Sequence, residues 1–444
     1  MKFKKSLSVL AGLTLAASVV TACGSSSSSS SPSPEASASA TASPAAAPKE
    51  KVTLTMWGGV PAENGPQAAV DAWNAKNPNV QVKYERYVND DAGNMKLDTA
   101  LTTGQNVDLY VNYTITNLTQ RLNAGTALDL SKFTDYKIDE KIAGASSWQI
   151  NNKYYALPTS KSHYFVWMNK DLLDQAGLKV PTAWTWDDMK QYADKLKSAS
   201  RYGLVQHTEP FPDSLDAVST MFGYTKKDGT SNLNDPLIGK WMETLKSMMD
   251  DGKATPKYSE QIVSKMPVDT VFLKGEAGML NAGTWIFRSS NNMKDNPRTF
   301  KIAFAPVPRL TTDSKDYIVR GGVGDAISIN PKSKYIDQAW EFLKWYADGG
   351  MMPLVSGGRF PASNAANQDE IMKALLGDQA ATYDLDSLKN VLFNNTPKFT
   401  RNLPKQVLDL RQEEYEKYFT GKQSIKDTLD NMAKRHNDFL KQNK

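Results

Sequence analysis

The chain has 444 residues, of which 40% are apolar, so it is long and apolar enough for two or three folded domains and is not mainly disordered. Its 53 basic and 48 acidic residues give a formal net charge of +5, and three of the lysines fall within the first five residues. This near-balance excludes the strongly basic surface typical of nucleic-acid binding. The single cysteine excludes an internal disulfide.

Residues 1–22 have the composition of a secretory signal peptide. Lys2, Lys4 and Lys5 make a basic start, and an apolar run follows that is too short for a stable membrane span. Cys23 comes directly after small residues and resembles the lipobox cysteine of bacterial lipoproteins. That resemblance implies that Cys23 is acylated and anchors the chain at the extracellular face of the cell membrane. An ordinary free or buried thiol is the alternative.

The segment 23–51, which begins with the lipidated cysteine, is rich in Ser, Ala and Pro. It contains too little apolar surface to offset the entropy lost on ordering, so we expect a disordered linker. A flexible coil of this length spans on the order of 30 Å and would let the following domain move near the membrane. A protease-sensitive stalk with no further role is the alternative.

The first ordered stretch alternates strands with helices. Its periodicity predicts strands at 52–56, 80–84 and 107–111 and helices at 66–75, 91–103 and 116–124. The short connections favour right-handed crossovers and a mostly parallel sheet, whose ligands bind beyond the carboxyl ends of the strands. Trp57, Glu63 and Tyr113 follow the first and third strands and are therefore candidate ligand contacts.

The remainder of the chain repeats this mixture of elements. It predicts strands at 154–157, 164–168, 202–206, 301–305 and 325–329, and helices at 234–251, 335–347, 404–419 and 424–440. The stretch 277–285 reads as a further strand that breaks at glycine into a turn. Thr185 is placed to cap a helix whose third residue is Asp188. The pattern favours an α/β fold with two lobes, between which the chain crosses more than once.

Several segments together resemble one family. They are Asn169–Leu173, Pro181–Asp188, Gly275–Trp285 and the glycine-rich Gly321–Ile329. In this order, behind a lipobox, they resemble the extracellular solute-binding proteins of ATP-binding-cassette (ABC) importers, in the branch that includes the maltose-binding protein. The resemblance covers nearly all of the chain from Val52. It implies a two-lobe periplasmic-binding-protein-like fold with hinge-connected lobes and a ligand cleft between them.

The resemblance also implies where the lobes begin and end. The chain should cross between them near 159–162, 281–284 and 347–358, where Pro or Gly interrupts the pattern. The N-lobe would then comprise residues 52–158 plus 284–347, and the C-lobe residues 159–283 plus 348–444.

Site residues follow from the matched segments. Trp285 comes after the glycine turn, where the family commonly stacks a tryptophan on a sugar ring. Glu209 and Phe211 belong to an acid–proline–aromatic triplet that resembles one lining sugar clefts. Tyr113 follows the third strand and Ser162 follows the first crossing. For each aromatic residue, packing in the core is the alternative.

Topology alone adds Arg359 to the candidates, beside Glu63 and Trp57. The acidic cleft residues that the family has near its first turn are not matched, because Val60 and Pro61 stand there. Aromatic faces suit the apolar face of a sugar ring, while carboxylates, amides and guanidinium groups suit its hydroxyls. The candidate set therefore favours a saccharide ligand.

Enzyme and metal signatures are largely missing. His163, His207 and His436 lie far apart without metal-ligand spacing, and the chain has no P-loop and no serine elbow. We expect no cofactor and no metal. A pair of carboxylates for glycoside hydrolysis stays open, because such pairs meet only in the fold.

The sequence therefore predicts a monomeric, lipid-anchored solute-binding protein rather than an enzyme. It would capture a sugar or oligosaccharide by lobe closure and deliver it to ABC permease subunits in the membrane, with no nucleic-acid partner. Two alternatives stay open: a surface-tethered carbohydrate-active enzyme, and a non-transport sugar sensor of the same fold.

Overall fold

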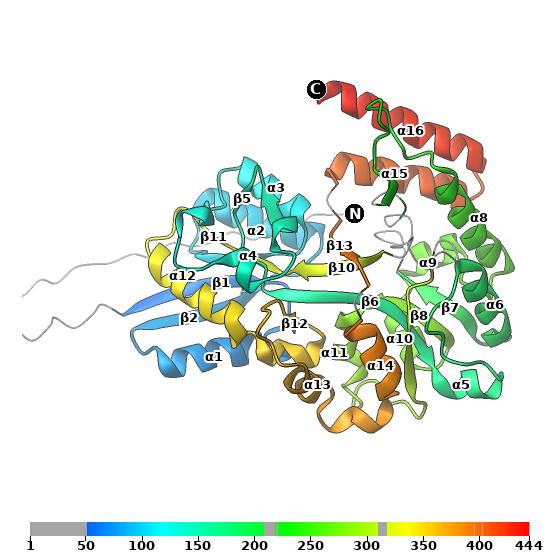
Figure 1. Cartoon of the computed structure of the whole chain (residues 1–444), viewed down its shortest axis with the longest axis horizontal. Coiled ribbons are helices and arrows are strands. Elements are labelled where there is room, and N and C mark those ends of the chain that lie inside the picture. Colours follow the sequence, from blue (N-terminus) through cyan, green and yellow to red (C-terminus); the bar gives the residue numbers. More distant parts are fainter. Residues whose placement is uncertain are drawn as a thin grey trace, which may run out of the picture. The chain divides into compact units, whose positions relative to one another are not determined.

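A computed structural model describes residues 51–207, 218, 221–309, 318–394, 396–401 and 403–443 (Figure 1). The expected signal peptide, Cys23 and the linker up to residue 50 lie outside these residues. Among the helices that the structure describes, none combines the length and apolar character needed to cross a bilayer.

The first sheet has four strands in the order β11-β3-β1-β2. β1 (Val52–Gly58), β2 (Val80–Arg86) and β3 (Leu109–Asn112) are parallel, whereas β11 (Ala326–Ile329) joins the edge antiparallel to β3. β1 occupies an inner position and is buried along almost its whole length. The predicted parallel arrangement is therefore confirmed for β1 to β3.

Helices pack against this sheet, and all but the short helix at residues 138–141 lie near the ranges that the sequence predicts. They are α1 (Pro66–Lys76), α2 (Asp91–Thr103), α3 (Ile115–Asn123), α4 (Ile138–Lys141) and α12 (Ile336–Trp345), with a small hairpin of β4 (Gln149–Ile150) and β5 (Lys153–Tyr154). α2 begins where the Asp90 side chain accepts a hydrogen bond from Gly93 N and ends at Gly104 in a left-handed conformation. The core joins Leu54 of β1 to Val70 of α1 and Leu343 of α12.

The second sheet has seven strands built around the long strand β6 (Ser160–Asn169), as Figure 1 shows. The others are β13 (Lys398–Phe399), β10 (Val319–Gly324), β8 (Ala277–Gly283), β7 (Tyr202–Gln206), β9 (Ile302–Pro306) and β12 (Phe360–Pro361). β10, β12, β8 and β9 all pair antiparallel with β6, while β7 is parallel to β8. This sheet is mixed and not mostly parallel, because β6 runs antiparallel to all four of the strands that pair with it.

The helices around the second sheet pack against it in two hydrophobic clusters. They are α5 (Lys170–Gln175), α6 (Trp186–Leu196), α8 (Pro236–Asp251), α9 (Tyr258–Ser264), α10 (Val268–Leu273), α11 (Phe287–Ser290), α13 (Gln368–Leu376), α14 (Leu385–Leu392), α15 (Lys405–Phe419) and α16 (Ile425–Gln442). The predicted cap of α6 is present, because the Thr185 and Asp188 side chains each bond the other's backbone. α15 and α16 pair with each other, and α16 packs on α8 (Figure 1).

The chain passes between the sheets at three places that lie together. β6 starts at Ser160, and Asp325 is the single residue between β10 and β11. Thr159 Oγ1 donates to the Asp325 carbonyl at 2.8 Å, and Ala362 N donates to the Thr159 carbonyl at 3.0 Å. Hydrogen bonds therefore link all three passages directly.

The passages near Thr159 and Ala362 lie near the crossings expected at 159–162 and 347–358. The third passage does not lie at the crossing expected at 281–284. Between residues 281 and 284 the chain stays with the second sheet, because β8 and the following β9 both pair with β6. The passage lies instead at Gly324–Asp325. The segment 284–347, expected in the N-lobe, therefore contributes β9 and β10 to the second sheet and β11 to the first.

Candidate functional site

A cavity of about 600 Å³ is lined from both sheets. Arg86 and Tyr113 reach it from the ends of β2 and β3, while Gln206 and Asn281 reach it from β7 and β8. A neighbouring hollow of about 240 Å³ shares several lining residues with it: Tyr113, Thr114, Ser162, Tyr164, Arg320, Asp325 and Arg401. The two form one cleft.

An aromatic wall closes one side of the cavity. Trp285 and Tyr164 meet edge to face, with ring centroids 5.2 Å apart, and His207 lies 6.1 Å from Trp285. The Trp285 ring folds back over Gly283, where a Cβ atom would lie 2.0 Å from the indole. Only glycine at this position leaves room for the ring, so the predicted glycine turn sets the orientation of the tryptophan.

Buried amide groups face the cavity beside this wall. Gln206 is 2% exposed and Asn281 is 7% exposed, and both line the cavity. Among the residues that the structure describes, neither polar atom of the Gln206 amide has a hydrogen-bond partner, and nor does Asn281 Oδ1. Buried polar atoms normally find partners, because leaving one unpaired costs about 1–3 kcal/mol. Such atoms at a cavity wall are ready to bond a ligand.

Tyr113 contributes its ring to the cavity while its hydroxyl is already engaged. The hydroxyl oxygen accepts a hydrogen bond from Gly59 N at 2.6 Å. Burial, followed by the nearby Asp325 carboxylate, raises the pKa of Tyr113 well above its ordinary value. The residue therefore stays neutral and presents an aromatic surface.

Arg359 and Asp325 form an ion pair in the cavity wall. Arg359 Nε donates to Asp325 Oδ2 at 2.9 Å, and each side chain is 19% exposed. Burial opposes the charge of Arg359, but Asp325, Tyr113 and Tyr346 together outweigh that effect and raise the pKa of the guanidinium. Arg359 Nη1 is buried without a partner among the described residues, so the guanidinium keeps an unused donor.

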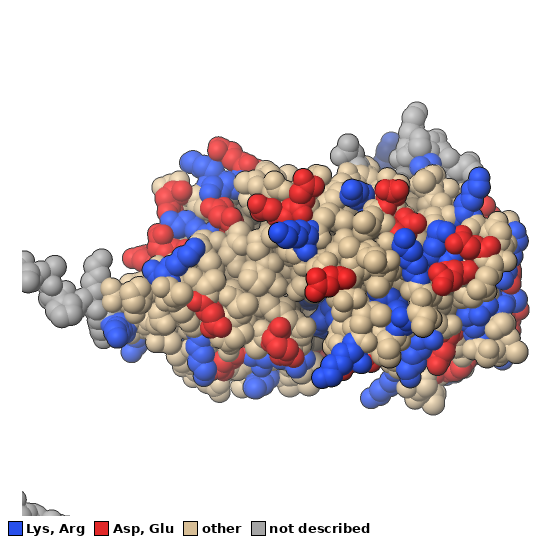
Figure 2. Space-filling view, turned by 90° about the horizontal axis from the view of Figure 1, so that it is seen from below, with Lys and Arg blue, Asp and Glu red and all other residues tan. Residues whose placement is uncertain are grey.

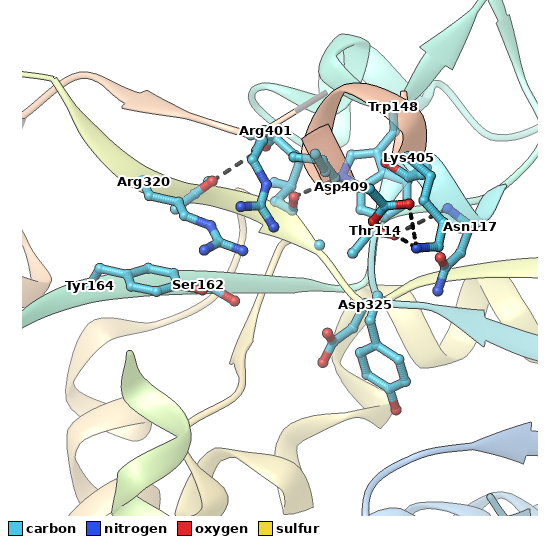
Figure 3. Close-up of a pocket in the computed structure, with 18 residues that line it drawn as sticks. Thr114, Asn117, Trp148, Ser162, Tyr164, Arg320, Asp325, Arg401, Lys405 and Asp409 are labelled. Atoms are coloured by element: carbon cyan, nitrogen blue, oxygen red, sulfur yellow. Dashed lines mark hydrogen bonds and ion pairs between the residues drawn. The ribbon is translucent and has the colours of Figure 1, made fainter. Parts of the chain in front are cut away.

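Four further arginines line the same cavity, namely Arg86, Arg288, Arg320 and Arg401. Arg320 lies over the Tyr164 ring, 5.0 Å from its centroid, and Figure 3 shows Arg320 and Arg401 reaching into the space above Ser162 and Tyr164. Burial lowers the pKa of Arg288, and the charge of Arg359 lowers it further. Among the described residues, the cavity wall therefore carries more basic than acidic side chains.

Residues 61–350 match the family of bacterial extracellular solute-binding proteins. The chain belongs to this family. A binding protein of Brucella abortus is 28% identical over 292 residues, which cover 64% of this chain and 68% of the relative. The arabinooligosaccharide-binding protein of Bacillus subtilis is 25% identical over 284 residues, covering 62% and 64% of the two chains.

Solved structures give the same fold. The maltose-bound MalE3 structure from T. maritima superposes with a TM-score of 0.69 at 20% sequence identity and covers 88% of this chain and 100% of that one. This solute-binding protein therefore has the two-lobe, periplasmic-binding-protein-like fold, and the family resemblance drawn from its sequence is confirmed.

Four of the residues predicted from sequence line the cavity of this solute-binding protein: Tyr113, Ser162, Trp285 and Arg359. They come from separate parts of the chain, so the fold brings them together. Glu209 and Phe211 lie outside the described residues.

Trp57 and Glu63 do not line the described cavity. Trp57 packs with Tyr87, Leu97 and Tyr110 in a separate buried cluster, because the end of β1 is covered by α2 and not by the second sheet. Glu63 is exposed on the short 3-10 helix Ala62–Asn64. Its carboxylate nevertheless acts on the cavity from outside, since it counters the lowering of the Arg288 pKa.

Several lining residues were not among those predicted from the sequence. Arg86, Gln206 and His207 stand at or just after the ends of β2 and β7, the same position that singled out Tyr113. The position at the end of a strand therefore marks these three residues in the sequence as well. Arg288 lies within the short helix α11, Arg401 follows the two-residue strand β13, and no pattern in the sequence marks either residue.

Two observations on the described residues concern metal ions and surface charge. It contains no group of three His, Cys, Asp or Glu side chains that could hold a metal ion. On the face in Figure 2, basic and acidic side chains are interspersed and no single sign covers a broad area. The arginines that line the cavity are thus not part of a broad basic patch on this face.

Proposed function

We propose that this solute-binding protein is lipid-anchored outside the cell, captures a sugar or oligosaccharide and delivers it to an ABC permease. The curated relative from Bacillus subtilis is named for arabinooligosaccharides, and the structural neighbour from T. maritima was solved with maltose bound. Family membership supports a binding role over an enzymatic one.

The observation that carries the proposal is the pairing of an aromatic wall with unpartnered buried amides. Trp285 offers a flat apolar surface, and Gln206 and Asn281 offer donors and acceptors at its edge. A pyranose has this same division, with C–H bonds on one face and hydroxyls around its rim. One ring could therefore stack on the indole while its hydroxyls bond the two amides.

Capture would proceed by closure of two lobes, one built on each sheet. Ligand bound to one wall gains contacts with the other wall only when the lobes approach, so it favours the closed state. The three passages near Thr159, Asp325 and Ala362 form a narrow, hydrogen-bonded connection about which the lobes would turn. The permease would then recognise the closed conformation as the ligand-bound form.

A binding experiment tests the proposal. The purified protein, without residues 1–50, is titrated with a panel of oligosaccharides in a calorimeter, and the mixtures are analysed for products. We expect saturable one-to-one binding that raises the melting temperature, with the saccharide recovered intact. Turnover of the saccharide would favour the tethered enzyme, and absence of binding across the panel would contradict the proposed function.

The lipid anchor is tested separately through Cys23. We expect Cys23→Ser to release the full chain from the membrane fraction without changing saccharide affinity. If the variant stays in the membrane fraction, then the proposed lipid attachment at Cys23 is wrong, whereas the proposed binding function is unaffected by that result.

A further inference from the structure

We infer that the saccharide carries an oxyanion, a carboxylate, sulfate ester or phosphate ester, that is held by Arg288 and Arg86 in the cavity. This inference rests on the proposed saccharide-binding function and specifies the chemistry of its ligand. Among the described lining residues, five are arginines and one is a carboxylate, Asp325. That carboxylate already pairs with Arg359, so it does not neutralise Arg288 or Arg86.

Arg288 and Arg86 provide the strongest part of this observation. Within the part of the chain that the structure describes, neither guanidinium has a hydrogen-bond or ion-pair partner. Arg288 is half-buried within the short helix α11, whereas Arg86 is exposed at the end of β2. The two come from different sheets and meet the same cavity, so an anion between them would contact both walls.

The charges around Arg288 also favour an anionic ligand. Burial and the positive charges of Arg359 and Arg86 all disfavour the charged form of Arg288. Asp269 and Glu63 favour that form, but neither lines the cavity, and Asp269 Oδ1 lies 3.0 Å from His207 Nε2. An anionic ligand would relieve this repulsion, whereas a neutral ligand would leave it in place.

The geometry of guanidinium groups suits this ligand class. Arginine presents a planar fork of donors that matches the oxygens of carboxylate, sulfate and phosphate groups in pairs. Arginines can also donate to sugar hydroxyls, so a neutral saccharide is the competing explanation. The two explanations differ in salt dependence and in the effect of removing one positive charge.

The test compares saccharides that differ only in charge. Galacturonate trisaccharide and the neutral galactose trisaccharide of the same linkage are titrated into the protein, with sulfated and phosphorylated galactosides as further arms. We expect at least about tenfold tighter binding of one anionic class, which also identifies the oxyanion. Its affinity should fall as ionic strength rises from about 0.01 to about 0.1 M, because the screening length shortens from roughly 30 to roughly 10 Å.

Charge-neutralising variants complete the design. Arg288→Gln should remove most of the preference for the anionic saccharide while retaining weak binding of the neutral one, and Arg86→Gln should act in the same direction. Lys76→Gln removes one positive charge from the exposed end of α1, outside the cavity, and should leave the preference unchanged. Circular dichroism and melting temperature establish that each variant is folded.

The outcomes separate this inference from the proposed function. Equal affinity for anionic and neutral saccharides would overturn the inference and leave the saccharide-binding function in place. Binding of no saccharide in any arm would overturn the proposed function, and the inference with it. A preference that survives in Arg288→Gln and Arg86→Gln would also overturn the assignment to these residues.

Discussion

Arg359 Nε donates to Asp325 Oδ2 at 2.9 Å and thereby ties together two of the segments that pass between the sheets. Asp325 is the single residue separating β10 from β11 and has a φ of 44°, in the left-handed region. A side chain other than glycine is strained there, so its contacts must hold the backbone in place. The ion pair and the hydrogen bond from Thr159 to the Asp325 carbonyl supply these contacts.

Removing the arginine should therefore weaken the fold near the passages. We expect Arg359→Gln to lower the free energy of unfolding by about 1–3 kcal/mol, because it leaves the Asp325 carboxylate mostly buried without its partner. Urea denaturation measures this loss. The double variant Arg359→Gln/Asp325→Asn should lose clearly less than the two single losses added together. Simple additivity would mean that the pair does not couple.

Gly358, next to Arg359, allows two chain segments to approach closely. Its φ is +78°, and a Cβ atom would lie 1.8 Å from the Thr284 carbonyl oxygen. Gly421 has a similar φ of +75°, but a Cβ atom there would meet no other atom within 4 Å, so it offers a matched control. We expect Gly421→Ala to cost about 1 kcal/mol from backbone strain alone.

Gly358→Ala should cost that same strain plus roughly 1–3 kcal/mol for the collision with the backbone of Thr284. Chemical denaturation of the two variants side by side measures the difference. Equal losses in Gly358→Ala and Gly421→Ala would mean that the segments at 284 and 358 are not in contact in solution.

His163 in β6 should make stability depend on pH. Burial lowers its pKa to about 3, with the charges of Lys398 and Lys161 acting in the same direction, and its ring meets Phe360 edge to face. In the unfolded chain the pKa is about 6.5. Above that pH the residue is neutral in both states, so its contribution is fully present there.

As pH falls below about 6.5, the unfolded chain binds a proton that the folded chain does not. Stability should therefore decline by up to about 1.4 kcal/mol per pH unit toward pH 3, in addition to the effect of carboxylates. His163→Gln removes this contribution, so the difference between variant and wild type should shrink from pH 7 to pH 5. A difference that stays constant over this range would contradict the buried, neutral histidine.

Much of the local structure could be predicted from the sequence because it rests on local signals. The period-two pattern at 52–56 predicted β1, and the bounds expected for α2, 91–103, agree with the structure because Asp90 and Gly104 cap its ends. The capping box at Thr185 has the same local origin. Resemblance to a family then supplied the two-lobe arrangement.

The rest depends on contacts between distant segments. Gly324–Asp325 became a passage between sheets because β10 pairs with β6 while β11 pairs with β3, and neither pairing is encoded near residue 325. The arginine-rich wall arises in the same way, since Arg86 and Arg288 lie far apart in the chain. Such juxtapositions exist only after folding.

Trp285 gives the sharpest test of the cavity as the binding site. It is partly buried, meets Tyr164 edge to face and lines the cavity, so it is available to a ligand in a way that the fully buried Trp241 is not. Trp285→Ala should remove an aromatic anchor worth about 2 kcal/mol or more. Affinity for the best saccharide of the panel should then fall roughly thirtyfold.

Trp241 provides the matched control, because it lies in the core 4.7 Å from Trp186 and outside the cavity. Trp241→Phe should lower the free energy of unfolding by about 1 kcal/mol or more through poorer packing, with saccharide affinity unchanged. Calorimetry and ligand-free melting temperature are measured on both variants. If Trp285→Ala kept its affinity and lost as much stability as a core substitution, then Trp285 would be a packing residue, and the ligand would have to bind elsewhere.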